Sequence, residues 1–177
     1  MILNVKILII IILCMLFISC EKNNVRHNYQ VINKETIEES LIETNINLLN
    51  KESELIDEYI KENNLDIVKT GTGLRYYIYK QGNGEFIKKG NIITLQYELS
   101  LLSGEIIYSS TTDGYKNFEV GRGGVERGLE EAVLKLRNES EAILILPSHL
   151  AHGYTGDGKK IPYMATLVYK IKVIDIK

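Results

Sequence analysis

The sequence predicts an α+β fold: a mostly antiparallel sheet with one short helix against it, preceded by an N-terminal helical segment. Two observations predict this class. Short apolar runs bounded by Gly, Asn and Pro recur from residue 74 to the C-terminus, and such runs are typical of buried strands. Apolar residues at helical spacing fill two other stretches, residues 35–64 and residues 125–136.

Residues 1–19 are predicted to be a lipoprotein signal peptide. Lys6 precedes the apolar run 7–18, as in secretory signals. The tetrapeptide 17–20, Phe-Ile-Ser-Cys, resembles the lipobox of bacterial lipoproteins, which implies cleavage before Cys20 and lipidation of that cysteine. The alternative is an uncleaved anchor helix, although the run is short for a bilayer core of about 30 Å. Either reading places the bulk of the chain outside the cytoplasm.

Cysteine and charge content narrow the class of protein further. The other cysteine, Cys14, lies within the signal, so we expect no disulfide in the mature chain. The mature chain keeps 23 acidic residues and the 21 basic ones less Lys6, a formal charge of about −3. Without basic runs, this balance predicts no nucleic-acid partner. We expect a lipid-anchored protein of the cell envelope, facing the periplasm or the cell exterior.

The mature chain is predicted to have three parts. Residues 20–34 are polar and form a tether, residues 35–68 form a helical extension, and residues 69–177 form the main domain. The boundary rests on the sequence Lys-Thr-Gly-Thr-Gly, which is rich in turn residues. Residues 47–51 are a candidate break that would divide the extension into two helices. Residues 35–64 are either a solvated spacer or a helix that docks on the domain or pairs with a second copy.

The main domain is predicted to contain six strands and one helix. The helix covers residues 125–136, with acidic residues early and basic residues late, as the helix dipole favours. The expected strands are 74–80, 92–102, 105–109, 118–120, 142–146 and a final strand that carries Tyr169.

A loop of about fourteen residues is predicted after Pro147, and hairpin loops of this length are often functional. It carries His149, His152 and Tyr154, whose side chains combine an apolar body with a polar tip. This composition is that expected of a flap over an apolar binding pocket.

The order of these elements and their motifs resembles the FKBP family of peptidyl-prolyl isomerases over residues 70–177. The lipobox and the helical extension are similar to lipoprotein members linked to gliding motility. The motifs that carry the resemblance are Gly73-Leu-Arg-Tyr-Tyr, Ile92–Tyr97, Ser103–Ser110, Phe118–Gly121, Val125–Glu130, Pro147–Gly153 and Ile161–Tyr169.

This resemblance implies a half-barrel sheet wrapped around the short helix, with a proline ring bound between them and no metal or cofactor. It implies catalytic roles for Tyr97, His152 and Tyr169. The substrate-binding residues that it implies are Ile107, Tyr108, Phe118, Val125, Glu126, Leu129 and Ile161.

Three positions depart from the pattern that the family usually shows, whereas Leu129, at a position that is Trp in many members, is a familiar replacement. Tyr108 stands in place of an Asp and Glu126 in place of an apolar residue. His152 replaces a loop tyrosine whose hydroxyl typically donates a hydrogen bond to the substrate carbonyl.

The expected activity is peptidyl-prolyl cis-trans isomerisation of X–Pro bonds in exported proteins, within an apolar cleft. The alternative is a catalytically weak chaperone or adaptor that holds exposed apolar or proline-bearing segments in the same cleft. Expected partners are exported X–Pro clients, the membrane through the N-terminal lipid, and a second copy through residues 35–64.

Overall fold

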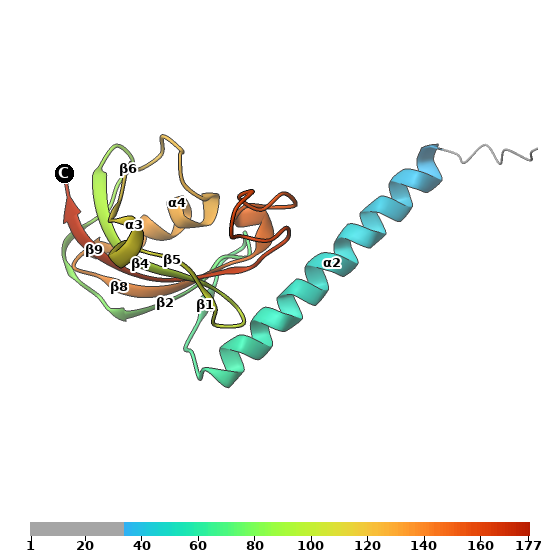
Figure 1. The fold of residues 1–177 in the computed structure, drawn as a ribbon, viewed down its shortest axis with the longest axis horizontal. Coiled ribbons are helices and arrows are strands. Elements are labelled where there is room, and N and C mark those ends of the chain that lie inside the picture. The colour runs from blue at the N-terminus through green and yellow to red at the C-terminus, as the bar shows by residue number, and fades with distance from the viewer. Residues whose placement is uncertain (1–33) are drawn as a thin grey trace, which may run out of the picture. The chain divides into compact units, whose positions relative to one another are not determined.

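The computed structural model describes residues 34–177 of the 177-residue chain (Figure 1). The predicted signal peptide, Cys20 and nearly all of the tether lie outside the described residues. Within residues 34–177, no helix combines the length and the apolar character that a membrane span requires.

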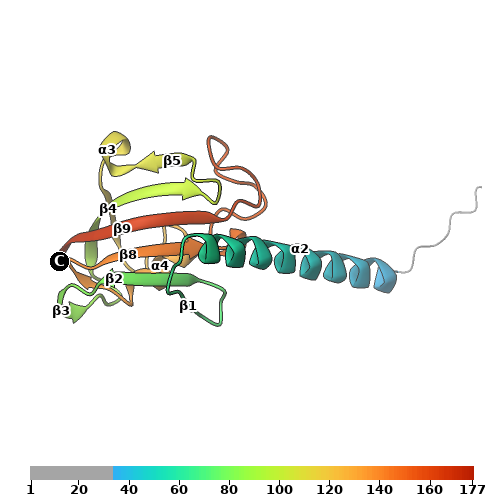
Figure 2. The ribbon, with the colours of Figure 1, turned by 90° about the horizontal axis from the view of Figure 1, so that it is seen from below.

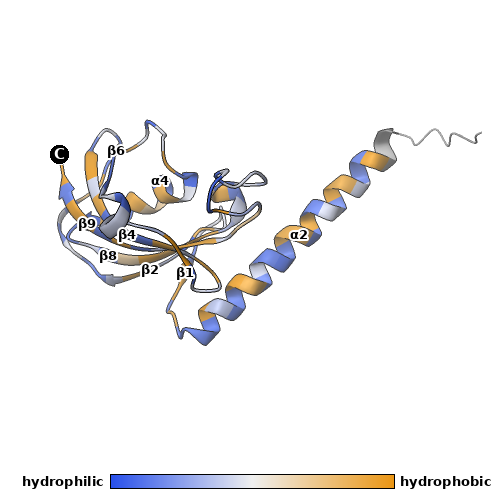
Figure 3. Cartoon of the chain, viewed as in Figure 1, coloured by the Kyte–Doolittle hydropathy of each residue, from blue (hydrophilic) through white to orange (hydrophobic). Residues whose placement is uncertain are grey.

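The helical extension is one continuous helix, α2 (Lys34–Glu62), so the break predicted at residues 47–51 is wrong. Asn and Lys in that stretch cost a helix little, and the stretch contains neither Gly nor Pro. The chain divides between Leu41 and Ile42 into two compact units, and the second contains the rest of α2 and the whole sheet. Apolar and polar residues alternate along α2 (Figure 3).

An antiparallel sheet dominates the second unit and confirms the predicted α+β class. Its strands follow the order β1-β2-β8-β9-β4-β5, and β6 pairs with the first half of β4 (Figure 2). All six predicted strands are present, as β2 (Arg75–Lys80), β4 (Ile92–Leu101), β5 (Ile106–Ser109), β6 (Lys116–Glu119), β8 (Glu141–Leu146) and β9 (Leu167–Ile176). Short elements that the sequence did not reveal are β1 (Val68–Lys69), β3 (Asn83–Phe86), β7 (Arg137–Asn138), α3 (Ser110–Asp113) and the 3₁₀ turn η1 (Ser148–Leu150).

The sheet curves around α4 (Arg127–Val133), the helix predicted at residues 125–136 (Figure 1). Leu129, Ala132 and Val133 of α4 are buried in the main apolar core together with the inward residues of the strands. Gly128 lets α4 approach β8 closely, because a Cβ there would lie 2.5 Å from Cγ of Leu146. The core therefore fixes the N-terminal end of α4 against the concave face of the sheet.

The last turns of α2 pack on the opposite face of the sheet. Ile56 is fully buried there in a second apolar cluster with Ile145 and Val168. The buried Arg75 guanidinium donates hydrogen bonds to Ser53 Oγ at 2.7 Å and to Asp57 Oδ1 at 3.0 Å. This part of α2 is thus a docked helix rather than a solvated spacer.

The loop between β8 and β9 runs from residue 147 to residue 166, longer than the predicted fourteen or so residues. The difference arises because β9 begins at Leu167, whereas the sequence suggested a strand soon after Pro162. We call residues 147–166 the flap.

Candidate functional site

A pocket of about 160 Å³ lies where the flap meets the sheet and the start of α4. Strands β4, β5 and β6, the residue before α4, and the flap each contribute to it. Its lining residues are Tyr97, Leu99, Tyr108, Lys116, Glu126, His152, Asp157 and Ile161.

Tyr97 is positioned by a local interruption at the edge of β4. Strands β5 and β6 both pair with β4, and α3 separates them, so the backbone of Tyr97 lacks a ladder partner on that edge. Ser110 fills the gap: its Oγ donates to Tyr97 O and accepts from Tyr97 N, both at 3.2 Å. The ring of Tyr97 then lies 6.1 Å from that of Tyr169, centroid to centroid.

Glu126 is the centre of a polar cluster inside the pocket. It is the N-cap residue of α4, with extended φ and ψ of −60° and 140°, but its side chain makes no capping hydrogen bond and lines the pocket instead. Oε1 accepts a hydrogen bond from the Tyr169 hydroxyl at 2.7 Å and lies 3.3 Å from His152 Nε2. Oε2 accepts from Lys116 Nζ at 3.4 Å. With 6% of its side chain exposed, Glu126 is a buried acid with three partners.

The partners of Glu126 control the protonation of the cluster. Burial raises the pKa of Glu126, but the ammonium of Lys116, the backbone N–H of Glu126 itself and the hydroxyl of Tyr169 act together against burial, and that pKa lies below its usual value. Burial, followed by the charge of Glu126, raises the pKa of Tyr169 well above its usual value. Glu126 is therefore an anion and Tyr169 a neutral hydrogen-bond donor at neutral pH.

Lys116 occupies the space beside the two tyrosine rings. Its Nζ lies 5.4 Å from the ring centroid of Tyr97 and 5.4 Å from that of Tyr169, within cation–π range. The same ammonium donates a hydrogen bond to the Tyr169 hydroxyl at 3.1 Å. The inner end of the pocket is therefore charged, in contrast to the apolar cleft that the sequence led us to expect.

A second polar pair closes the flap side of the pocket. Tyr108 donates its hydroxyl hydrogen to Asp157 Oδ2 at 2.5 Å, and Oδ1 of Asp157 accepts from the backbone N–H groups of Lys159 and Ile161. Burial opposes ionisation of Asp157, but these donors lower its pKa to about 2. Gly156, with φ of +64°, permits this tight loop, because a Cβ there would lie 2.1 Å from Ile161 O.

Five of the residues that the resemblance implies line this pocket together. They are Tyr97, Tyr108, Glu126, His152 and Ile161.

The other implied residues lie beneath the pocket or beside it. Tyr169 and Leu129 are fully buried, so neither side chain lines the pocket itself. Ile107 and Phe118 belong to the apolar core. Val125 is partly buried against that core and lines a separate shallow groove outside α4.

Sequence reasoning did not select Lys116, Leu99 or Asp157. Lys116 lies two residues before Phe118 on the same strand and therefore on the same face, so the alternation of β6 could have identified it. Leu99 likewise follows Tyr97 by two residues. Asp157 carried no local signal, because its role depends on a contact with Tyr108 across 49 positions of sequence.

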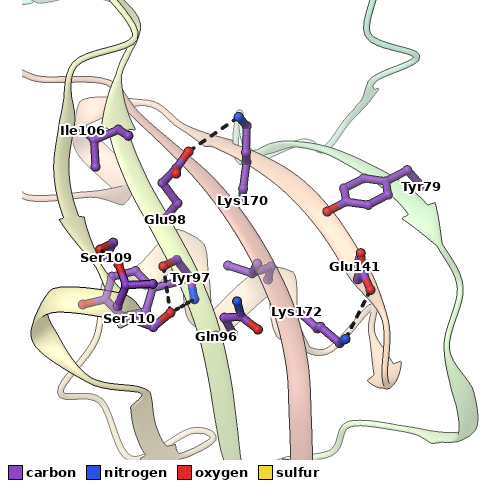
Figure 4. A pocket seen from close by; sticks show the side chains of 12 residues that line it. Tyr79, Gln96, Tyr97, Glu98, Ile106, Ser109, Ser110, Glu141, Lys170 and Lys172 are labelled. Carbon is purple, nitrogen blue, oxygen red and sulfur yellow. Dashed lines mark hydrogen bonds and ion pairs between the residues drawn. The ribbon is translucent and has the colours of Figure 1, made fainter.

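A larger groove of about 410 Å³ lies on the outer face of the sheet, over β4, β8 and β9 (Figure 4). Ion pairs cross it, with Glu98 3.5 Å from Lys170 and Glu141 3.6 Å from Lys172. These residues alternate with the core-facing residues of their strands, which is typical of the solvated face of an antiparallel sheet. We therefore assign the candidate site to the smaller pocket beneath the flap.

Comparisons with known proteins agree with this fold. The family model described as FKBP-type peptidyl-prolyl cis-trans isomerase matches residues 83–174. The probable FKBP-type isomerase FkpA of Neisseria meningitidis is 38% identical over 108 residues, which are 60% of this chain and 39% of that protein. FK506-binding protein 1 of Dictyostelium discoideum is 31% identical over 106 residues, which are 59% of this chain and 99% of that protein.

The crystal structure of FkpA from Escherichia coli has the same fold. It superposes with a TM-score of 0.64 at 22% identity and covers 90% of this chain and 74% of that one. The matched residues include all of the pocket beneath the flap. The chain belongs to the family of FKBP-type peptidyl-prolyl cis-trans isomerases.

Proposed function

We propose that this protein is a peptidyl-prolyl cis-trans isomerase that acts on X–Pro bonds of exported proteins. The observation that carries the proposal is the pocket beneath the flap of an FKBP domain, where Tyr97, His152 and Ile161 converge from β4 and the flap. The extracytoplasmic clients follow from the N-terminal signal that the sequence predicts.

Rotation about an X–Pro bond makes modest chemical demands. The uncatalysed reaction takes tens of seconds with an activation energy of about 20 kcal/mol. No bond breaks and no proton must move, so neither a nucleophile nor a metal is needed. The planar amide is stabilised by resonance that places negative charge on the carbonyl oxygen. A site that binds the twisted amide better than the planar one accelerates rotation about tenfold for each 1.4 kcal/mol of difference.

The pocket contains groups that can stabilise the twisted amide more than the planar one. Tyr97, Leu99 and Ile161 provide apolar walls that exclude water from the carbonyl oxygen of a bound peptide. His152 is partly exposed in the flap, and because its Nε2 faces Glu126, an N–H at its other ring nitrogen can donate a hydrogen bond to that oxygen.

The test is a protease-free assay of cis-to-trans relaxation of an Ala–Pro peptide, with the full chain in detergent. We expect a relaxation rate that rises linearly with protein concentration. Ile161→Ala should lower the catalysed rate about tenfold, because it opens the apolar wall to water. The control Ile106→Ala alters a residue that is 57% exposed outside this pocket and should keep the rate. Relaxation that stays at the uncatalysed rate would rule the enzyme out.

A second candidate function is a weakly catalytic chaperone or adaptor of the same fold. The observation that favours it is the charged inner end of the pocket, where Lys116 and Glu126 replace apolar surface. Suppressed aggregation of an unfolded client, without faster prolyl isomerisation, would select this function over the first.

We also propose that the protein is anchored to the membrane through lipid on Cys20 and that it self-associates through α2. The support for self-association is that several apolar side chains of α2 are exposed, among them Leu41, Ile42, Ile46 and Leu49. A purely monomeric mass in sedimentation equilibrium across micromolar concentrations would contradict it.

A further inference from the structure

Resting on the proposed isomerase function, we propose that Lys116 is a specificity-determining residue. In the free protein its ammonium fills the inner end of the pocket, and it leaves when a prolyl ring enters. The displaced ammonium then pairs with a carboxylate of the peptide. The substrate class is therefore X–Pro segments with an Asp or Glu beside the proline.

Lys116 covers the surface that a prolyl ring would need. Its Nζ lies 5.4 Å from the centroids of both tyrosine rings and 3.1 Å from the Tyr169 hydroxyl. Tyr169, which the family resemblance places in contact with the ring, is fully buried and is one of the two rings that this ammonium covers. The ring and this ammonium therefore compete for the same space.

Lys116, and not Glu126, is the group that moves when the prolyl ring enters. The ammonium ends a flexible four-carbon stem, and 24% of the Lys116 side chain is exposed, so it has a path to solvent. Glu126 is 6% exposed and keeps the hydroxyl of Tyr169 and the ring of His152 as neighbours when Lys116 leaves.

The neighbouring carboxylates of Asp157 and Asp113 already accept hydrogen bonds from other donors. Asp157 accepts from Tyr108 and from two backbone N–H groups, and Asp113 accepts from Ser109 N and Thr112 Oγ1. The ammonium of Lys160 is engaged as well: it lies 5.0 Å from the ring centroid of Tyr108 and donates to Ile107 O at 3.2 Å. A peptide carboxylate is therefore an acceptor that the displaced Lys116 ammonium can reach without breaking the hydrogen bonds of Asp157 or Asp113.

The experiment measures kcat/KM for Glu–Pro, Ala–Pro and Lys–Pro peptides of otherwise identical sequence. We expect the wild-type protein to favour Glu–Pro over Lys–Pro by about tenfold. The informative variant is the double substitution Lys116→Met with Glu126→Gln. Either single change would alter the net charge of the pocket as well as its occupancy, whereas the double change removes both charges and keeps similar shapes.

In the double variant we expect kcat/KM for Ala–Pro to rise about tenfold and the charge preference to fall below about threefold. Binding of fluorescently labelled Ala–Pro peptide, followed by anisotropy, should tighten in parallel. The matched control is Lys170→Met with Glu98→Gln, which makes the same changes in an ion pair on the outer face of the sheet. If the double variant does not fold, Lys116→Gln with Glu126→Gln replaces it, because two amides can bond to each other.

The outcomes separate this inference from the proposed function. Wild-type acceleration, with unchanged rate and affinity in a folded double variant, overturns the role of Lys116. Equal wild-type rates for Glu–Pro and Lys–Pro overturn the acidic preference. If no variant accelerates isomerisation but the double variant binds Ala–Pro more tightly, the enzyme proposal fails and the role of Lys116 stands. Absence of peptide binding by every variant overturns both.

Discussion

Two phenolic hydroxyls organise the charged side chains of this pocket, one on each side. Tyr169 donates to Glu126 at 2.7 Å, and Tyr108 donates to Asp157 at 2.5 Å. Each pairing stabilises the ionised carboxylate and raises the pKa of the tyrosine. The charge state of the pocket therefore depends on hydroxyl groups that a phenylalanine could not provide.

We predict that Tyr108→Phe makes the protein less sensitive to acid. The pKa of Asp157 is lowered from 3.8 to about 2, so Asp157 adds stability above pH 3.8 that is lost as the pH falls toward about 2. Without the hydroxyl this pKa moves back toward 3.8. The variant should then have a lower free energy of unfolding than wild type at pH 7, and this difference in free energy should shrink as the pH falls toward about 2.

Urea unfolding at several pH values and the carboxyl carbon NMR shift of Asp157 measure this effect. Tyr163→Phe is the matched control, because Tyr163 lies in the same flap and is 74% exposed. An Asp157 pKa that stays near 2 in Tyr108→Phe would contradict the assignment.

At the scale of elements, α2 holds both ends of the flap. Oε1 of Glu52 accepts from Ser148 N at 2.6 Å and from Thr166 Oγ1 at 2.7 Å, and Oε2 accepts from Ser148 Oγ at 3.0 Å. Tyr154, within the flap, donates to Asn45 Oδ1 at 2.8 Å. A helix outside the family domain thus positions the segment that carries His152 and Asp157.

We predict that Glu52→Ala loosens the flap while the sheet stays folded. Loss of an ionised acceptor with three donors should cost about 1–3 kcal/mol of unfolding free energy. Amide hydrogen exchange at Ser148 should accelerate, because its N–H loses a 2.6 Å bond. Glu54→Ala, which removes an exposed acid from the same helix, is the control and should change neither quantity. Unchanged exchange at Ser148 would show that α2 does not hold the flap.

At the scale of the whole molecule, the family match covers only part of the chain. The family match covers residues 83–174, and the chain spans 39% of the Neisseria relative. We propose that the place where the protein acts is set by residues outside the shared domain, above all by a lipid at Cys20.

We predict that Cys20→Ala releases the protein from membranes. Two signals, or one lipid with a second contact, are generally needed for stable anchoring, and the variant would lack its acyl chains. Membrane and soluble fractions after a high-salt wash measure the effect. Full retention of the variant in the membrane fraction would favour the uncleaved anchor helix instead.

Local patterns were sufficient for most elements of the fold. Apolar runs and turn residues predicted all six main strands, and the spacing of Leu129 and Val133 predicted α4. The failures have local causes. Two-residue strands such as β1 and β7 carry too little periodicity, and the flap was predicted too short because the apolar residues after Pro162 precede β9.

The sequence by itself determined the α+β class, the family and five of the residues that line the pocket. It could do so because alternation and motif order are properties of neighbouring positions. Only the tertiary structure decided the chemistry of the pocket. Lys116, Glu126 and Tyr169 come from three separate segments, and the curved sheet and α4 bring these side chains together in a largely buried cluster. In such surroundings a pairing decides whether each group is charged, and no stretch of sequence encodes that pairing.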